Sequence, residues 1–189
     1  MRDLYKHYPV RFLVAALSAA LAACSASNIK NENSVFYAVP VGSTLQLNQQ
    51  LEIQGEQVAV YAQKGALKQY NEVDFYVPNC KFEIYTMNEQ PRTVEQDIFE
   101  IIKVVDDIES SALQKNTKLA VLEGGVTLGI LDRSSVFNYA TLMYLKSEKQ
   151  KDVYRMTCQH WEDIMDDRHL SIQQMRDAMG EIFTLEVKK

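Results

Sequence analysis

The densest group of side chains that could do chemistry lies between Cys158 and His169. It holds two of the three histidines of the chain, His160 and His169, among several carboxylates. Imidazole nitrogens and carboxylate oxygens are common ligands of divalent metals. The candidate ligands are His160, Asp163, Asp167 and His169. Their spacing matches no known ligand motif, so we expect no metal and no other cofactor.

Cys158 could instead act as a nucleophile. His160 lies two residues on, and this spacing would put a base on the same face of a strand. Other catalytic motifs lack support, because no G-x-S-x-G sequence exists and Gly124-Gly125 lacks the glycine pattern of a phosphate loop. The many acids single out no glycosidase pair. The sequence therefore favours a protein that is not an enzyme.

The amino-terminal residues have the organisation of a secretory signal. Basic residues Arg2, Lys6 and Arg11 precede the run FLVAALSAALAA at residues 12–23. A membrane-spanning helix needs about 20 apolar residues, whereas this shorter run suits the core of a signal peptide. The run ends in Leu21-Ala22-Ala23-Cys24. We therefore predict that residues 1–23 are a signal peptide.

The sequence Leu21-Ala22-Ala23-Cys24 resembles the lipobox of bacterial lipoproteins. The resemblance implies that Cys24 becomes the first mature residue and carries acyl chains. Ser25, rather than aspartate, follows it. In Gram-negative lipoproteins this implies sorting to the outer membrane, with the domain facing the periplasm. The expected partners are the membrane, through Cys24, and an unidentified envelope protein.

The composition of the amino-terminal segment differs from that of residues 24–189. The whole chain has 189 residues and a formal charge of −5, and residues 24–189 alone carry 17 Lys+Arg and 24 Asp+Glu, a formal charge of −7. That acidity argues against nucleic-acid binding and against electrostatic attraction to a membrane. Residues 24–34 are predicted to be the lipidated cysteine and a solvated tether, and residues 35–189 a single β-rich domain.

Two cysteines remain when Cys24 is assigned to lipid. Cys80 and Cys158 form an even pair in an exported chain, and oxidising compartments favour disulfides. We predict a Cys80–Cys158 bridge, with Trp161 packed beside it. On this interpretation the acids that follow are solvated or pair with Arg168 and Arg176.

Alternating apolar residues predict strands through most of the domain. Strands are expected at residues 58–62, 73–77, 80–84, 99–107, 137–145, 153–160 and 182–187. Residues 45–53 are predicted to be one long strand or a tight hairpin. Residues 93–108 also fit one face of a helix, but their many β-branched side chains favour a strand. Residues 110–118 are expected to be a loop, and Gly124-Gly125 a hairpin turn.

One helix is predicted at residues 172–179. Ser171 with Gln174 forms a capping box, and Gly180 suits the position after the helix. The predicted fold is mainly β, an antiparallel sandwich or partly open barrel with one short C-terminal helix.

Two stretches of the mature chain resemble a family of small uncharacterised Gram-negative lipoproteins. These are residues 36–44, FYAVPVGST, and residues 158–161, CQHW. The leading hypothesis is a lipid-anchored, non-enzymatic binding or structural module. The alternatives are a periplasmic carrier of a small ligand, which needs an enclosed pocket, and a metal-dependent enzyme that uses His160 and His169 together.

Overall fold

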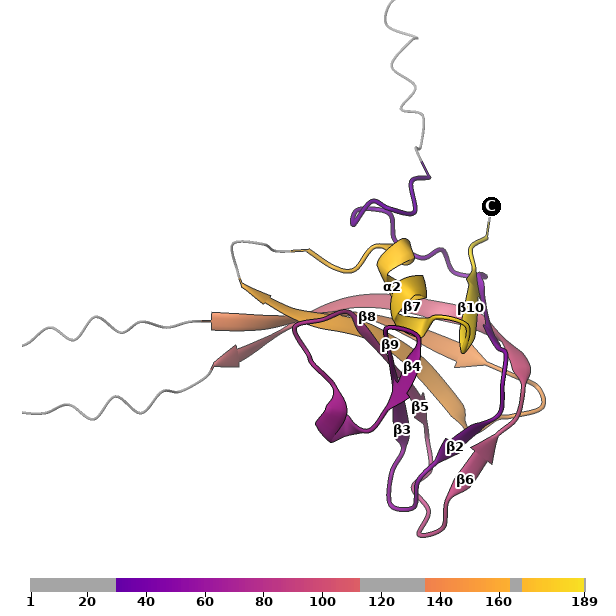
Figure 1. The fold of residues 1–189 in the computed structure, drawn as a ribbon. Coiled ribbons are helices and arrows are strands. Elements are labelled where there is room, and N and C mark those ends of the chain that lie inside the picture. The colour runs from indigo at the N-terminus through magenta and orange to yellow at the C-terminus, as the bar shows by residue number, and fades with distance from the viewer. Residues whose placement is uncertain (1–29, 113–134, 164–167, 189) are drawn as a thin grey trace, which may run out of the picture. The chain divides into compact units, whose positions relative to one another are not determined.

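The computed structural model describes residues 30–112, 135–163 and 168–188. The main element of this part of the chain is one curved antiparallel sheet, a half-barrel (Figure 1). Its strands are β1 Thr44–Leu47, β3 Ala59–Gln63, β4 Ala66–Lys68, β5 Asn79–Ile84, β7 Asp97–Ala112, β8 Ser135–Lys146, β9 Val153–Asp163 and β10 Phe183–Glu186. They lie in the order β10-β1-β7-β8-β9-β5-β3-β4. Two shorter strands, β2 (Leu51–Ile53) and β6 (Arg92–Val94), pair separately. The predicted mainly β fold is confirmed, in its partly open form.

One face of the sheet, called here the inner face, carries the core. On it Phe82 of β5 lies opposite Met156 of β9, and both are fully buried. Helix α2 (Ile172–Met179) packs on the core side against β3, β5 and β10. The buried side chains of the helix are Ile172, Met175, Ala178 and Met179. The opposite side of the sheet is called the outer face.

Helix α2 begins and ends where the sequence predicts. The Ser171 hydroxyl accepts a hydrogen bond from the backbone N–H of Gln174 at 3.2 Å, and the Gln174 side chain accepts one from the backbone N–H of Ser171 at 2.9 Å. After the last turn Gly180 has a φ of 57°. The capping box and the glycine at the helix end are therefore confirmed.

A hairpin turn contacts the carboxyl end of the helix. Lys64 and Gly65 connect β3 to β4 with positive φ angles of 53° and 73°, as tight hairpins require. The backbone N–H of Gly65 donates to the carbonyl of Ala178 at 3.1 Å. The last carbonyls of a helix have no partner within the helix, so the hairpin satisfies one of them.

The strand interpretation of residues 99–107 is confirmed, and the strand is longer than predicted. β7 runs from Asp97 to Ala112, so residues 110–112, predicted as the start of a loop, continue the ladder with β8. The pairing of two long strands satisfies more backbone groups than an early loop would. The predicted Gly124-Gly125 hairpin lies outside the described residues.

Residues 45–53 form neither of the two predicted arrangements. β1 pairs with β7 and β10, whereas β2 pairs with β6 in the second sheet. Asn48 separates them, since its side-chain amide donates to the Glu181 carbonyl at 2.9 Å and to the Thr184 hydroxyl at 2.8 Å. These contacts turn the chain away from the first sheet before β2 begins.

Residues 73–77 are a loop rather than the predicted strand. The Gln63 side chain bonds to the backbone groups of Asp74 and to the Val77 carbonyl, and so replaces a strand partner. The short 3₁₀ helix η1 (Tyr70–Glu72) leads into this loop. The predicted break at residues 78–79 corresponds to the start of β5 at Asn79.

The fold begins within the segment predicted as a tether. The backbone carbonyl of Glu32 accepts from Gln173 at 3.1 Å, and its carboxylate pairs with Arg176, so this residue already contacts α2. In Figure 1 the indigo amino-terminal segment passes beside the helix. Within the described ranges, no helix is long and apolar enough to cross a membrane.

Candidate functional site

The predicted Cys80–Cys158 disulfide is present. The two cysteines are register partners on β5 and β9, their sulfurs are 2.04 Å apart, and both residues are fully buried. The Cys80 sulfur also lies 3.8 Å from the carbonyl of Met175 in α2. The bridge thus joins two neighbouring strands beneath the helix. A nucleophilic role for Cys158 is incompatible with this oxidised state.

Beyond the disulfide, the inner face carries a cluster of rings. Tyr139 of β8 is the register partner of His160 on β9, and their ring centroids are 6.0 Å apart. His169, just before α2, places its ring edge-on to Tyr139 at 5.8 Å. The Thr141 hydroxyl donates to Asp106 at 2.8 Å, and the same carboxylate oxygen lies 4.0 Å from Nδ1 of His169. The fold therefore brings His160 and His169, two of the candidate ligands named from the sequence, into contact with the same residue, Tyr139.

The His160 imidazole is buried, and its Nδ1 has no hydrogen-bond partner among the residues that the structure describes. Its pKa is lowered chiefly by burial, which penalises the charged ring. Glu162, whose carboxylate lies 3.9 Å from Nε2, acts in the opposite direction, whereas Arg168 and His169 lower the pKa further. His160 is consequently held in its neutral form.

This arrangement does not form the metal site that was considered from the sequence. Asp163 follows His160 by three residues and therefore points to the other face of β9. Asp167 lies outside the described residues. Within the described ranges, no group of three or more histidine, cysteine or acidic side chains could hold a metal ion. The two histidines instead pack as rings around Tyr139.

Acidification is expected to destabilise the fold through His160. The unfolded chain binds a proton near the ordinary histidine pKa of about 6.5, whereas the folded protein binds it only at lower pH, so stability falls as the pH drops through this window. We expect His160→Phe, which keeps a ring against Tyr139, to lose less stability than the wild type between about pH 7.5 and 5.5. Urea unfolding of both proteins at the two pH values measures the difference.

The effect of His160 on stability falls in a different pH range from the effects of the acids Glu83 and Asp97. Burial alone would raise the pKa values of Glu83 and Asp97, but hydrogen bonds and nearby cations outweigh it and lower both. Their stabilisation is lost only below the ordinary carboxyl pKa of about 4. An equal loss of stability in wild type and His160→Phe above pH 5.5 would contradict the role of His160.

Trp161 lies on the outer face and does not pack beside the disulfide as predicted. Its ring stacks on Phe75 at 5.0 Å and meets Tyr76 edge-on at 5.6 Å. Phe75 in turn contacts Tyr61 and Tyr70, and the backbone N–H of Trp161 donates to the Phe75 carbonyl at 2.6 Å. Strand alternation explains the difference, because Trp161 follows Cys158 by three positions and an odd offset places two side chains on opposite faces of a strand. Arg176, one of the two predicted partners of these acids, pairs with Glu32.

A ladder of side-chain amides lies beside Trp161 and was not found from the sequence. The Asn138 amide donates to Gln159 at 3.0 Å, Gln159 donates to Asn79 at 3.4 Å, and Asn79 donates to the Val77 carbonyl at 3.0 Å. The three amides come from β8, β9 and β5, so only strand pairing brings them together. The ladder holds Val77, at the carboxyl end of the loop of residues 73–77, against the sheet.

A buried ion-pair network occupies the outer face further along β5 and β9. Glu83 accepts hydrogen bonds from Arg155 at 2.5 Å and from Thr157 at 3.0 Å, and Lys81 lies 3.0 Å away. The Arg155 guanidinium also lies 4.9 Å from the ring centre of Tyr154. These groups satisfy one another, which is the condition under which charges are buried. The Glu83 carboxylate is therefore engaged by Arg155, Thr157 and Lys81.

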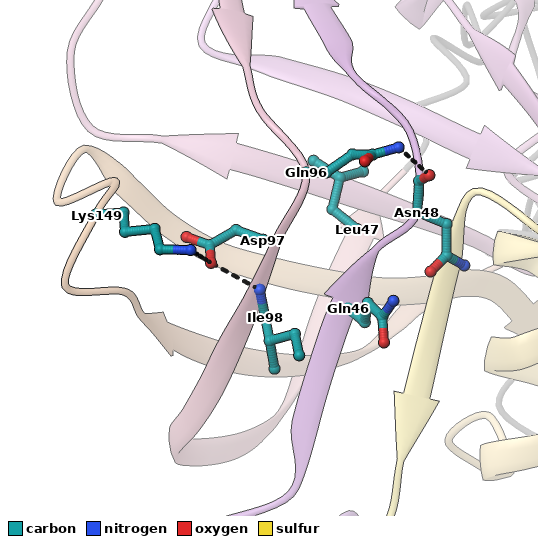
Figure 2. Close-up of a pocket in the computed structure, with 7 residues that line it drawn as sticks. All are labelled: Gln46, Leu47, Asn48, Gln96, Asp97, Ile98 and Lys149. Atoms are coloured by element: carbon teal, nitrogen blue, oxygen red, sulfur yellow. Dashed lines mark hydrogen bonds and ion pairs between the residues drawn. The ribbon is translucent and has the colours of Figure 1, made fainter.

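Figure 2 shows an open depression where β1 and β7 meet. It has a volume of about 440 Å³ and is lined by Gln46, Leu47, Asn48, Gln96, Asp97, Ile98 and Lys149. Asp97 accepts from the Ser147 hydroxyl at 2.6 Å and from the Ile98 N–H at 2.9 Å. Gln96 donates to the Asn48 carbonyl at 2.5 Å. These polar groups of the wall bind one another. The depression is open to solvent, whereas a carrier of a small ligand is expected to have an enclosed pocket.

No family model matches this chain, and searches of curated proteins and of solved structures likewise found no match. Cys24, the predicted lipid attachment site, lies outside the described residues.

Proposed function

We propose that this protein is a lipid-anchored envelope lipoprotein of the outer membrane, with its half-barrel facing the periplasm. One observation carries the proposal, namely the order of basic residues, apolar run and Leu21-Ala22-Ala23-Cys24. A single acyl chain gives only marginal membrane binding, so stable attachment requires more than one chain. Cys24 is the residue to which the lipobox resemblance assigns them.

The disulfide supports an exported location. Cys80–Cys158 is a fully buried structural bridge, and such bridges form and persist in oxidising compartments rather than in the cytosol. The bridge takes up two of the three cysteines, so that Cys24 alone is left for lipid. Both assignments agree with a domain that folds in the periplasm.

We further propose that the half-barrel is a non-enzymatic binding or structural module. The groups that could catalyse a reaction already have structural partners. His160 and His169 pack against Tyr139, Cys158 is oxidised, and Glu83 is neutralised by Arg155. This use of reactive groups favours a binding module over the metal-dependent enzyme.

Replacing the lipid attachment residue tests the proposal. The wild-type chain, expressed in a Gram-negative host, should begin at Cys24 and carry acyl chains there, and it should fractionate with the outer membrane. Cys24→Ala should lose the acyl chains and the membrane attachment. Mass spectrometry of the amino-terminal peptide and membrane fractionation measure both results.

Ser25→Asp is the matched control for sorting. In lipoproteins with a comparable lipobox, aspartate at this position implies retention at the inner membrane, so this variant should be acylated but no longer reach the outer membrane. A wild-type chain that keeps residues 1–23, or has an unmodified Cys24, would contradict lipid anchoring. Outer-membrane fractionation of acylated Ser25→Asp would contradict the sorting assignment alone.

A further inference from the structure

A tight turn at residues 34–37 exposes an aromatic side chain. The backbone N–H of Tyr37 donates to the Ser34 carbonyl at 3.2 Å, and the Ser34 hydroxyl accepts from the N–H of Phe36 at 3.3 Å. Phe36 is 95% exposed, the highest value among the exposed large apolar residues of the described ranges. Full burial of a phenylalanine side chain is worth about 1.5–3 kcal/mol, so this exposure leaves a large apolar surface in water.

The turn is fixed to the domain on both sides. Before it, Glu32 contacts Gln173 and Arg176 of α2. After it, Tyr37 packs against the core and Val39 is buried within it. Phe36 is therefore held away from the core by its anchored neighbours. A side chain held in this way is presented to whatever lies beside the amino-terminal end of the fold.

The chain between Cys24 and the fold is short. Only residues 25–30 separate Cys24 from Asn31, where the compact domain begins. An extended chain spans at most about 3.6 Å per residue, so these seven steps reach no farther than about 25 Å. This argument rests on the proposed lipidation of Cys24. If the acyl chains are in a bilayer, the turn that carries Phe36 lies close to that bilayer.

The charge of this segment does not oppose membrane contact. Residues 31–42 contain no Lys, Arg or Asp, and Glu32 is their only acid. Its carboxylate is paired with Arg176. Residues 31–42 thus contribute only −1 to the formal −7 of residues 24–189, and the other −6 is carried elsewhere. An uncharged turn with an exposed ring suits the boundary between lipid headgroups and acyl chains, where aromatic residues are enriched.

We propose that Phe36 inserts into the headgroup–acyl boundary of the bilayer that holds the acyl chains of Cys24. The lipid supplies the attachment, and Phe36 supplies a second contact point. Two points of contact fix an orientation that attachment through lipid alone would leave free. The residues of α2 that Glu32 contacts, Gln173 and Arg176, then lie on the side of the domain nearest the membrane.

A tryptophan placed at position 36 reports this contact. Lipidated full-length Phe36→Trp is reconstituted in phosphatidylethanolamine–phosphatidylglycerol vesicles that contain lipids brominated near the top of the acyl chain. Its matched control is Tyr85→Trp. Tyr85 is also well exposed, at 62%. It follows the last residue of β5, whereas Cys80, which contacts helix α2, lies near the first residue of that strand. Both variants keep Trp161, so the difference between them isolates the introduced ring.

The expected result is a blue-shifted emission and at least twofold stronger quenching for Phe36→Trp than for Tyr85→Trp. Equal quenching of the two variants would overturn the inference. A blue shift without quenching would also overturn it, because a second copy of the chain, not lipid, would then cover the ring. Mass spectrometry of the same samples separates the two proposals, since unmodified Cys24 contradicts both, whereas acylated protein with an unquenched Trp at position 36 contradicts only the membrane contact.

Discussion

Replacing both Cys80 and Cys158 with alanine is expected to lower the free energy of unfolding by about 4.5 kcal/mol. The bridge closes a loop between residues 78 positions apart, and loop-closure entropy removed from the unfolded chain grows with loop length. For a domain of this size the melting temperature should fall by roughly 9 to 18 °C. Urea and thermal unfolding measure the change. The Cys24→Ala background serves as the reference, because it removes lipid and prevents mispairing of a third thiol.

The burial of the bridge provides a second measurement. Both cysteines are inaccessible to solvent, so a reductant should reach them only when the protein opens. Thiol release in native buffer should therefore be slow, and it should accelerate in urea near the unfolding midpoint. A double alanine variant with unchanged stability, or rapid reduction of the folded protein, would contradict the structural role of the bridge.

Gly180→Ala is expected to cost about 3 kcal/mol or more. A Cβ at this position would lie 2.4 Å from the Cα of Gly65, so helix and hairpin would have to separate. Their separation would break the hydrogen bond from Gly65 to the Ala178 carbonyl. The positive φ of Gly180 adds strain for any residue with a Cβ. The melting temperature should fall by roughly 6 to 12 °C.

Gly42→Ala is the matched control for this effect. Gly42 also has a positive φ, of 85°, but its new Cβ would meet the end of the Lys188 side chain, which can move aside. This variant should show the backbone strain alone, about 1 kcal/mol. Equal stabilities of the two variants would show that the close approach of Gly180 to Gly65 contributes nothing.

Local patterns of the sequence predicted the features that depend on neighbouring residues. The capping box of Ser171 and the break at Gly180 define α2 because each involves atoms within one helical turn. The β-branched residues of 99–107 favoured a strand over a helix through their own side-chain stiffness, and β7 confirms this. The cysteine pair was predictable because only two cysteines remained once Cys24 was assigned to lipid.

Other predictions failed where a distant residue decides the local structure. Residues 73–77 alternate like a strand, yet Gln63 takes their backbone hydrogen bonds and holds them as a loop. Residues 45–53 were predicted to be one long strand or a tight hairpin, but Asn48 bonds to Glu181 and Thr184, more than 130 positions away. Periodicity reports which residues are apolar, and it does not report which partner a strand has.

The features of the candidate sites likewise fall into those that the sequence predicted and those that only the tertiary structure decided. The sequence by itself predicted the cysteine bridge and the short helix, and it is the basis of the proposal that Cys24 carries lipid, because motif, capping and cysteine count can be read without the tertiary structure. Only the tertiary structure decided that His160 and His169 pack around Tyr139, that Trp161 lies on the outer face, and that three amides from β5, β8 and β9 form a ladder. These arrangements depend on strand register, and register is set by the combined burial of the whole sheet rather than by any one segment.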